Sequence, residues 1–199
     1  MTSRDMTGIL LAGGRSSRFG SDKALAPWKG GTVIGSVISA ISPLFPVILL
    51  VTRDPGKYAF LESSVVKLVA DSYPEEHPMG GLHTGLSNSS TPYSFACACD
   101  MPLINPALVE KICGLADGWD AVVPVFGGFP QPLCAVYSRN CTDVIGQMIS
   151  DSNLRVRDIA NNVRTRLVSE DEVRSVDPGG DSFTDIDTPD DLEKASGRK

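Results

Sequence analysis

A short stretch near the amino terminus, residues 11–23, combines glycines with three cationic side chains in an acidic chain. Its sequence is LAGGRSSRFGSDK, and the cations are Arg15, Arg18 and Lys23. Glycines allow backbone N–H groups to approach a phosphate closely, and nearby cations neutralise its charge. The spacing matches neither the Walker A loop nor the dinucleotide-binding fingerprint. From these residues alone, a phosphate-binding loop and an ordinary surface loop stay equally open.

Carboxylates follow two apolar segments further along the chain. Asp71 lies at the end of the apolar run 65–70, and Asp100 directly follows residues 93–99. Carboxylate oxygens are ligands that Mg²⁺ prefers, although an aspartate in such a place is also a common turn or capping residue. Zinc is not expected, because the two histidines, His77 and His83, have no thiols spaced beside them.

The segments that precede these groups are continuously apolar, which predicts buried strands, and segments with helical apolar spacing lie between them. Strands that alternate with helices in this way are typical of a largely parallel sheet covered on both faces. We therefore expect an α/β fold, a single-domain three-layer α/β/α protein with a mostly parallel, Rossmann-like sheet. Its core is expected to span about residues 7–193, between short flexible tails.

The boundaries of the predicted strands and helices follow from the same apolar patterns. A capping residue before a proline marks the start of two helices, at Asn105-Pro106 and Thr188-Pro189. Residues 127–130, Gly-Gly-Phe-Pro, are expected to form a mobile loop. Strands are expected at residues 7–11, 47–51, 65–69, 93–99, 121–125, 133–137 and 164–168. Helices are expected at residues 33–44, 57–62, 81–89, 105–115, 140–149 and 154–160, and from residue 188 onward.

In folds of this kind, ligands bind beyond the carboxyl ends of the parallel strands. The predicted strand ends carry the glycine loop, Thr52-Arg53, Asp71 and Asp100. A glycine loop beside two carboxylates predicts a phosphate at this edge of the sheet with a cation nearby.

Composition excludes several classes of protein. The 199 residues carry a net charge of −6, which is unfavourable for binding nucleic acid through a basic surface. No apolar run reaches the ~18 residues that span a bilayer, and the first residues lack the apolar segment of a signal peptide. The five cysteines contain no Cys-x-x-Cys pair and are expected to be buried, reduced thiols. We expect a cytoplasmic protein that contacts neither nucleic acid nor membrane.

The order of the motifs resembles that of the molybdenum cofactor guanylyltransferases (MobA type), within the GT-A-like nucleotidyltransferase superfamily. Residues 11–23 match Leu-Ala-Gly-Gly-x-Ser-x-Arg-x-Gly-x-x-Lys, in which Leu-Ala-Gly-Gly points to guanylyltransferases. The resemblance extends from Gly8 to Leu192. The supporting motifs are Asp71, Pro78-Met79-Gly80-Gly81-Leu82, Cys99-Asp100-Met101-Pro102, Gln131-Pro132-Leu133 and Phe183-Thr184-Asp185-Ile186-Asp187-Thr188-Pro189-Asp190-Asp191-Leu192.

The resemblance implies transfer of GMP from GTP to the phosphate of Mo-molybdopterin, which yields molybdopterin guanine dinucleotide and pyrophosphate. It implies Mg²⁺ as the cofactor, with Asp100 and Asp187 as metal ligands, although Asp187 could also simply begin the helix at Thr188. Catalytic roles are implied for Lys23, Arg18 and Asp100. Nucleotide contacts are implied for Leu11, Ala12, Gly13, Gly14, Arg15, Lys23, Asp71, Gly80, Gly81 and Asp100.

Contacts to the pterin substrate are expected from Gln131, Arg155 and Arg157. The two arginines lie two residues apart on a predicted helix, so they do not share a face, and a solvated helix explains them equally well. Transient contacts with cofactor-biosynthesis proteins or acceptor molybdoenzymes are a further expectation.

Three places differ from the family pattern. His77-Pro78 stands where Gly-Pro is frequent, and Thr52-Arg53 stands where asparagine is frequent. Asp185 and Asp187 stand where asparagines are frequent, and this aspartate form also occurs in related cytidylyltransferases. The alternatives are therefore a molybdopterin cytidylyltransferase or another small nucleotidyltransferase and, outside the enzymes, a nucleotide-binding protein that delivers the cofactor.

Overall fold

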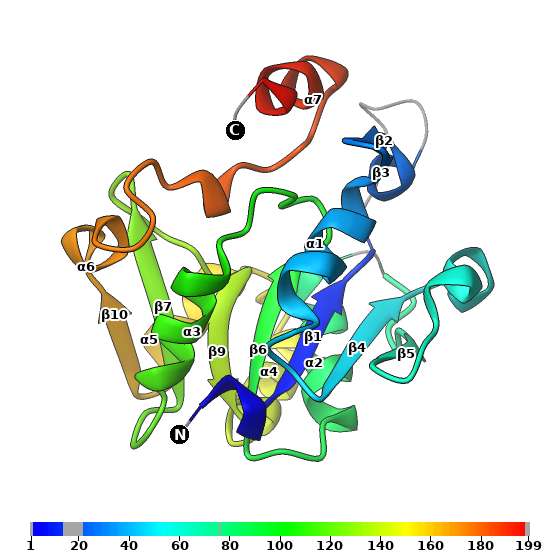
Figure 1. The fold of residues 1–199 in the computed structure, drawn as a ribbon. Coiled ribbons are helices and arrows are strands. Elements are labelled where there is room, and N and C mark those ends of the chain that lie inside the picture. The colour runs from blue at the N-terminus through cyan, green and yellow to red at the C-terminus, as the bar shows by residue number, and fades with distance from the viewer. Residues whose placement is uncertain (1, 14–21, 76, 198–199) are drawn as a thin grey trace.

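A mixed, mostly parallel sheet forms the centre of the computed structural model, which describes residues 2–13, 22–75 and 77–197 (Figure 1). Its strands are β1 (Thr7–Leu11), β4 (Val47–Thr52), β5 (Val66–Ala70), β6 (Tyr93–Ala98), β7 (Ala121–Phe126), β8 (Phe129–Pro130), β9 (Cys134–Ser138) and β10 (Thr165–Val168). The order is β10-β7-β9-β6-β1-β4-β5, and β8 pairs with β7. Neighbouring strands are parallel except at β9, which is antiparallel to both β6 and β7, and at β8.

Helices cover both faces of this sheet. One face packs against α1 (Val33–Ile41), α3 (Pro106–Gly114) and α6 (Glu170–Arg174). The other packs against α2 (Pro78–Asn88), α4 (Cys141–Ser150) and α5 (Ile159–Asn162). The expected three-layer fold is confirmed. Among the described helices, none is long and apolar enough to cross a membrane.

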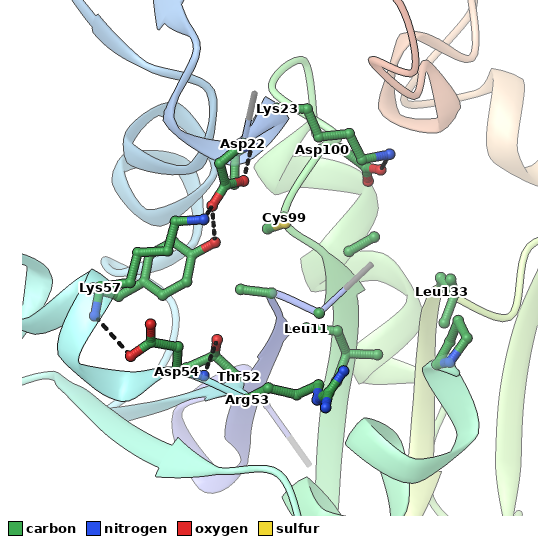
Figure 2. Close-up of a pocket in the computed structure, with 16 residues that line it drawn as sticks. Leu11, Asp22, Lys23, Thr52, Arg53, Asp54, Lys57, Cys99, Asp100 and Leu133 are labelled. Atoms are coloured by element: carbon green, nitrogen blue, oxygen red, sulfur yellow. Dashed lines mark hydrogen bonds and ion pairs between the residues drawn. The ribbon is translucent and has the colours of Figure 1, made fainter. Parts of the chain in front are cut away.

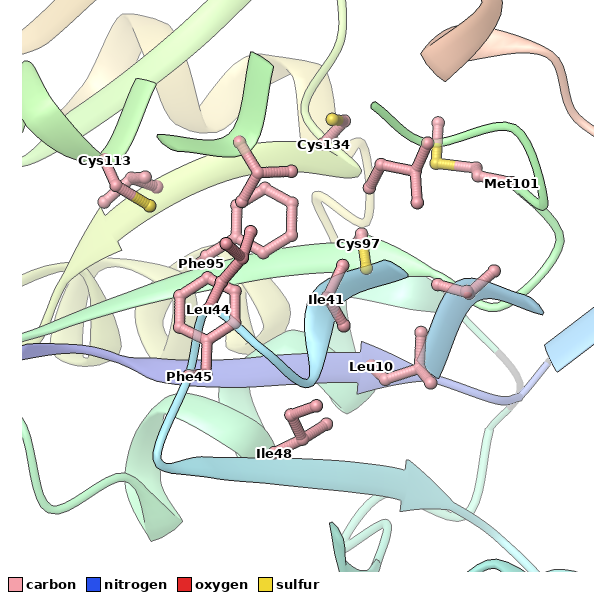
Figure 3. Close-up of a cluster of buried hydrophobic side chains, with 14 of the residues drawn as sticks. Leu10, Ile41, Leu44, Phe45, Ile48, Phe95, Cys97, Met101, Cys113 and Cys134 are labelled. Atoms are coloured by element: carbon pink, nitrogen blue, oxygen red, sulfur yellow. The ribbon is translucent and has the colours of Figure 1, made fainter. Parts of the chain in front are cut away.

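The central strand β1 sends alternate side chains into two separate cores, as the two-residue period of a strand requires. Leu10 enters the core beneath α1 and α3, where the rings of Phe45 and Phe95 stack at 5.5 Å (Figure 3). Ile9 and Leu11 enter the core beneath α2 and α4. Each such buried side chain stabilises the fold by about 1.5–3 kcal/mol. The two cores together fix the carboxyl end of β1 and of its neighbours.

The C-terminal segment returns to the N-terminal half of the chain. The hairpin of β2 (Pro27–Trp28) and β3 (Gly31–Thr32) shares a small core with α7 (Pro189–Ser196), in which Trp28, Ile186 and Ala195 are buried. The N–H of Ile186 also donates to the C=O of Asp100 at 2.9 Å. The residues before α7 are therefore held beside the end of β6.

The predicted strands are confirmed within one or two residues of each end. Residues 127–130, expected to form a mobile loop, form a hairpin turn and the short strand β8, because Gly127 and Gly128 adopt the positive φ angles that a tight hairpin turn needs. The helix expected at 154–160 is a 3₁₀ turn, Val156–Asp158, followed by the short α5. The Asn153 side chain accepts the N–H of Arg155 at 3.3 Å and starts that turn.

Candidate active site

The carboxyl ends of β1, β4 and β6 border a pocket of about 460 Å³, which we call the main pocket (Figure 2). This is the edge at which open α/β sheets bind their ligands, and the volume suits a nucleotide-sized molecule. The lining residues are Leu11, Ala12, Gly13, Asp22, Lys23, Ala24, Thr52, Arg53, Asp54, Lys57, Tyr58, Pro78, Ala98, Cys99, Asp100 and Leu133.

Lys23 joins two carboxylates that come from distant parts of the chain. Its Nζ forms ion pairs with Asp100 and, at 2.6 Å, with Oδ1 of Asp187. The side chains of Lys23 and Asp100 are 17% and 13% exposed, whereas that of Asp187 is 55% exposed, so Asp100 is the deeper partner. Burial opposes charge on Lys23, but the two carboxylates outweigh it and raise its pKa above the ordinary value. The ammonium therefore stays charged across the physiological pH range.

Local structure positions each member of this trio. Lys23 begins a 3₁₀ turn that Asp22 caps by accepting the N–H of Ala24 at 3.0 Å. Asp100 comes just after β6. Asp187 precedes α7, whose cap is the hydroxyl of Thr188, so the Asp187 carboxylate is not used to begin that helix.

The two carboxylates can hold a divalent cation. Oδ1 of Asp100 is buried and finds no hydrogen-bond partner among the described residues. Its other oxygen contacts the ammonium of Lys23, so a positive group already lies between Asp100 and Asp187. The described part of the chain forms no cage of three or more metal-ligating side chains. A pair of carboxylates fits Mg²⁺, which commonly binds through one or two carboxylates, substrate phosphates and water.

A third aspartate, Asp185, adds negative charge at the same edge. Desolvation and the nearby charges of Asp100 and Asp187 raise the pKa of Asp185 to about 7, against the opposing effect of Lys23. The residue still has a solvent-exposed side. Asp185 therefore gains or loses its charge near neutral pH, and a cation among these carboxylates would keep it ionised.

Another wall of the main pocket carries charged residues that the sequence did not single out. The hydroxyl of Tyr58 donates to Oδ2 of Asp22 at 2.7 Å, and Nζ of Lys57 lies 2.5 Å from the same oxygen. Burial alone would raise the pKa of Asp22, but these bonds hold it below the ordinary value. Lys57 and Tyr58 lie on a 3₁₀ helix, Pro55–Leu61, for which Asp54 before Pro55 was the available sequence signal.

A small cavity of about 10 Å³, which we call the side pocket, lies next to the main pocket. Oδ1 of Asp71 accepts hydrogen bonds there from the hydroxyl of Thr84 at 2.9 Å and from the N–H of Tyr73 at 3.1 Å. A Cβ at Gly81 would come within 3.3 Å of Leu11 and 3.7 Å of Oδ2 of Asp71, so glycine keeps this surface open. The lining residues are Leu11, Gly13, Val51, Arg53, Asp71, His77, Pro78 and Gly81.

Gly80 has different surroundings from its neighbour. A Cβ at Gly80 would lie 2.9 Å from Cβ of Tyr73 and 3.1 Å from the ring of His77. Nδ1 of His77 accepts the N–H of Gly80 at 2.9 Å and caps α2. Gly80 therefore allows the start of α2 to approach Tyr73 closely, and His77 has a structural role as a helix cap.

The residues expected to contact a pterin are not among those that line the main pocket in the described structure. The amide of Gln131 donates to the C=O of Phe129 at 3.2 Å, within the β7–β8 hairpin. Arg155 is exposed and precedes the 3₁₀ turn. Arg157, whose side chain is 67% exposed, lines a second pocket of about 460 Å³ together with Leu167.

The first half of the glycine loop reaches the candidate site. Leu11, Ala12 and Gly13 all line the main pocket. The N–H of Ala12 donates to the C=O of Val51 at 2.8 Å, so the chain leaves β1 in a fixed direction. Gly14, Arg15 and Arg18, which the sequence also assigned to this site, lie outside the described residues.

The cysteines contribute no nucleophile to the main pocket. All five are free and buried, as expected. Burial raises the pKa of the Cys99 thiol, the one that lines the pocket, far above its ordinary value. The thiol is therefore protonated, whereas a cysteine nucleophile reacts as the thiolate.

Comparisons with known proteins show which family the chain resembles. A family model described as the MobA-like NTP transferase domain matches residues 8–166. The molybdenum cofactor guanylyltransferase of Desulfosudis oleivorans is 36% identical over 192 residues, which cover 96% of this chain and 94% of that protein. The probable molybdenum cofactor guanylyltransferase of Natranaerobius thermophilus is 32% identical over 195 residues, which cover 96% and 95%. A crystal structure of molybdopterin-guanine dinucleotide biosynthesis protein A from Archaeoglobus fulgidus superposes with a TM-score of 0.82 at 26% identity, covering 96% of this chain and 97% of that one.

Proposed function

The chain belongs to the MobA-like NTP transferase family, and from this premise we propose that it is a molybdenum cofactor guanylyltransferase. It transfers GMP from GTP to the terminal phosphate of Mo-molybdopterin and releases pyrophosphate. The observation that carries this assignment is the ion-paired trio of Lys23, Asp100 and Asp187, which lies where a strand-end pocket meets a glycine loop. Relatives of nearly the same length that carry this activity in their names support it.

The reaction needs charge control more than proton transfer. The second pKa of a phosphate monoester is ~6, so the attacking pterin phosphate is already ionised at neutral pH and needs no general base. One of its oxygens bonds to the α-phosphorus of GTP while the bond from that phosphorus to the bridging oxygen breaks, and pyrophosphate leaves with those electrons. The difficulty is to bring one anion onto another, so positioning and neutralisation supply most of the catalysis.

Lys23 supplies positive charge to this step from beside the two carboxylates. Its ammonium is charged, lies at the pocket and is oriented by two carboxylates. We assign it to the β- and γ-phosphates and the leaving pyrophosphate, together with Arg18 and Arg15. The backbone from Leu11 to Gly14 donates N–H groups to the same phosphates.

Asp100 and Asp187 would hold Mg²⁺ when it is bound, and that ion would neutralise charge on the α-phosphate region of the nucleotide. The buried, unpartnered oxygen of Asp100 supports this assignment. The proposed site is metal-dependent because two carboxylates facing phosphates without a cation would oppose binding.

The nucleoside end of GTP is assigned to the part of the main pocket that borders the side pocket. Asp71 offers a fixed carboxylate in the side pocket, and glycine at position 81 keeps the surface beside Leu11 open. Gly80 contributes indirectly, because it lets the start of α2 lie close to Tyr73, and His77 caps the same helix. For the pterin substrate, the second pocket supports Arg157 most directly, because Arg157 lines it. Gln131 follows Pro130, which lines the same pocket, and Arg155 lies two residues before Arg157.

We place the protein in the cytoplasm, where its buried cysteines stay reduced. Its substrates are GTP and Mo-molybdopterin. Contacts with cofactor-biosynthesis proteins or acceptor molybdoenzymes would follow from the need to pass on a finished cofactor.

A nucleotide panel followed by a transfer assay tests the assignment. Thermal unfolding is measured with GTP, CTP, ATP and UTP, each with Mg²⁺, and GTP is expected to give the largest upward shift because only a bound ligand stabilises the native state. Pyrophosphate release is then measured with GTP and Mo-molybdopterin. A larger shift and faster release with CTP would indicate the cytidylyltransferase instead. Binding of GTP without pyrophosphate release would indicate a delivery protein.

A further inference from the structure

Asp22 connects the turn that carries Lys23 to a different part of the chain. Its Oδ1 accepts the N–H of Ala24 at 3.0 Å and so closes the turn at Lys23. Its Oδ2 accepts a hydrogen bond from the hydroxyl of Tyr58 at 2.7 Å, 36 residues further along the chain. Tyr58 lies on the 3₁₀ helix Pro55–Leu61, between β4 and β5. One carboxylate therefore joins the turn to this helix.

We propose that Tyr58 is a positioning residue for the transfer reaction: through Asp22, it fixes the turn from which Lys23 reaches the phosphates. The proposal rests on the proposed guanylyl transfer, and it adds a residue outside the motifs that carry the family resemblance. A lysine on a loosely held turn would seldom meet the phosphates in the productive geometry, so a fixed turn should raise kcat.

Tyr58 is itself firmly held, as an anchor has to be. The residue is only 4% exposed, and its side chain belongs to the core beneath α1 and α3. Ala24, in the turn, is buried in the same core. The turn is thus fixed at two points, by the methyl group of Ala24 inside the core and by the carboxylate of Asp22 beside the pocket.

Asp22 serves this connection and is not left open to bind a metal ion. Both of its oxygens have partners, because the ammonium of Lys57 lies 2.5 Å from the oxygen that also accepts from Tyr58. Asp100, by contrast, leaves one buried oxygen without a partner among the described residues. Burial opposes ionisation of Asp22, but hydrogen bonds from Lys57 and Tyr58 outweigh it and keep the pKa below the ordinary value. The hydroxyl of Tyr58 therefore donates to an ionised acceptor, which strengthens the bond.

The two ends of Lys23 are fixed by separate contacts. Its backbone lies in the turn that Asp22 closes, whereas its ammonium pairs with Asp100 and Asp187. Figure 2 shows the side chain running from the turn at Asp22 toward Asp100. When the ammonium turns from a carboxylate to a phosphate, the turn keeps its backbone in place. Loss of the Tyr58 hydroxyl should therefore lower kcat more than it raises the KM for GTP.

The test is a double-mutant cycle on pyrophosphate release from GTP and Mo-molybdopterin with Mg²⁺. It compares the wild-type chain, Tyr58→Phe, Lys23→Ala and the double variant. Tyr58→Phe removes the hydroxyl and keeps the buried ring, and it is expected to lower kcat about tenfold while the KM for GTP stays within about twofold. In the Lys23→Ala chain the same change is expected to have no further effect, because there is no ammonium left to position.

A second readout observes Lys23 without the reaction. In ¹⁵N-labelled protein, nuclear magnetic resonance detects the ammonium signal of Lys23, which is identified by its loss in Lys23→Ala. Hydrogen exchange of this ammonium with water is expected to be about tenfold faster in Tyr58→Phe, because the turn opens more often.

Two control variants separate the hydroxyl from other effects. Tyr93→Phe removes a hydroxyl from the half-buried residue at the amino end of β6 and should keep the wild-type kcat and ammonium exchange. Lys57→Gln should lower kcat less than about fivefold, because its side chain is 43% exposed and water screens its ion pair with Asp22. Circular dichroism and thermal unfolding verify that each variant is folded.

The inference fails if Tyr58→Phe lowers kcat by the same factor with and without Lys23, since Tyr58 would then act independently of the ammonium. A folded Tyr58→Phe with the wild-type kcat and ammonium exchange would also overturn it. So would a larger loss in Lys57→Gln than in Tyr58→Phe, because charge and not the hydroxyl would then hold the turn. A wild-type chain that releases no pyrophosphate would overturn the guanylyl transfer, and the ammonium exchange would still decide whether Tyr58 holds Lys23.

Discussion

At the scale of single residues, the site depends on a cation that is shared between carboxylates from distant parts of the sequence. Lys23 contacts Asp100 and Asp187, and Asp185 lies close enough for its pKa to rise to about 7. Among the described residues, the ammonium of Lys23 is paired with both Asp100 and Asp187 and offsets this concentration of negative charge. Substitutions of any of these four residues should therefore affect the electrostatics of the site more than the packing of the core.

Asp100→Ala should abolish turnover without unfolding the chain. The carboxylate is mostly buried yet leaves one oxygen without a partner, so the fold gains little from it while a metal ion would gain a ligand. Pyrophosphate release and Mn²⁺ binding, followed by electron paramagnetic resonance, measure the effect. Asp117→Ala, at an exposed turn, is the control. Near-wild-type activity of Asp100→Ala with Mg²⁺ would refute the metal assignment.

Lys23→Ala should lower kcat for pyrophosphate release by roughly 10²-fold or more, because a preorganised charge facing the phosphates is removed. Steady-state kinetics with GTP and Mo-molybdopterin measure it. The exposed Lys67 of β5 provides the matched control, and Lys67→Ala should retain the wild-type rate. An unchanged kcat in Lys23→Ala would mean that the ammonium only ties the C-terminal segment to the pocket.

Asp185 should make the metal-free protein less stable as the pH rises. An aspartate has a pKa of 3.8 when unfolded, and the folded value is about 7, so between these values the native state binds more protons than the unfolded state. Stability from this group is therefore lost as the pH rises through that window. In EDTA, Asp185→Asn should raise Tm relative to wild type at pH 8, and the difference should shrink toward pH 4. A difference that is independent of pH would contradict this account.

Much of the site could be predicted from the sequence, because its main groups directly follow strongly apolar strands. Asp71 and Asp100 follow β5 and β6, so the parallel sheet brings them to one edge. Tyr58 and Lys57 escaped prediction, because their role depends on a hydrogen bond and an ion pair with Asp22, more than thirty residues away. No local pattern encodes a contact across that separation.

At the scale of elements, two helix glycines differ in their surroundings, one at the sheet and one in solvent. Gly85 of α2 lies against Ile9 of β1, where a Cβ would come within 2.6 Å of the isoleucine side chain. Gly114, at the end of α3, is exposed and has no atom within 4 Å of its Cβ position among the described residues outside its own helix. The close approach of α2 holds Gly81 above Leu11, so this helix contact also shapes the side pocket.

Substitution of the two glycines by alanine should change the free energy of unfolding in opposite directions. Gly85→Ala should destabilise the fold by about 1–3 kcal/mol, because an added methyl group overpacks the contact between α2 and β1. Gly114→Ala should be neutral or stabilise by up to about 1 kcal/mol, because alanine has the higher helix propensity and nothing obstructs it. Urea unfolding followed by circular dichroism measures both. Equal effects would contradict the difference in surroundings between Gly85 and Gly114.

Sequence patterns predicted the strands better than their directions or the turns between them. Periodicity identified β9, but it carries no information on whether a strand runs parallel to its neighbours, and β9 is antiparallel to both. Helix α6 was missed because it has five residues, too few for a periodic apolar face. Its capping box of Ser169 and Glu172 was a usable signal.

At the scale of the whole molecule, the C-terminal segment completes a site that the rest of the chain begins. Ile186 is fully buried between the β2–β3 hairpin and α7, and its N–H bonds to the C=O of Asp100. Asp185 and Asp187 flank it, so the packing of one apolar side chain determines where both carboxylates lie. Part of the negative charge of this acidic chain is therefore concentrated around Lys23.

Ile186→Ala should weaken Mn²⁺ binding as well as stability. Loss of the buried side chain is expected to cost about 2–5 kcal/mol, whereas Ile186→Val should cost about 0.5–1.5 kcal/mol. Because Asp187 is fixed through this contact, Ile186→Ala should also bind Mn²⁺ more weakly, and Ile186→Val should bind it nearly as wild type does. Urea unfolding and electron paramagnetic resonance provide the two measurements. If Ile186→Ala folds and binds Mn²⁺ with unchanged affinity, the packing of Ile186 does not determine the position of Asp187.

The hydrogen bond between Ile186 and Asp100 also has a consequence for folding during synthesis on the ribosome. Chains emerge from the amino end and fold as they emerge, so the strands that form the main pocket are available well before residue 187 is synthesised. Asp187 follows Asp100 by 87 residues. The second carboxylate can therefore join the site only after this further length of chain has emerged, and a nascent chain that has not reached residue 187 would hold a nucleotide pocket with one carboxylate of the pair.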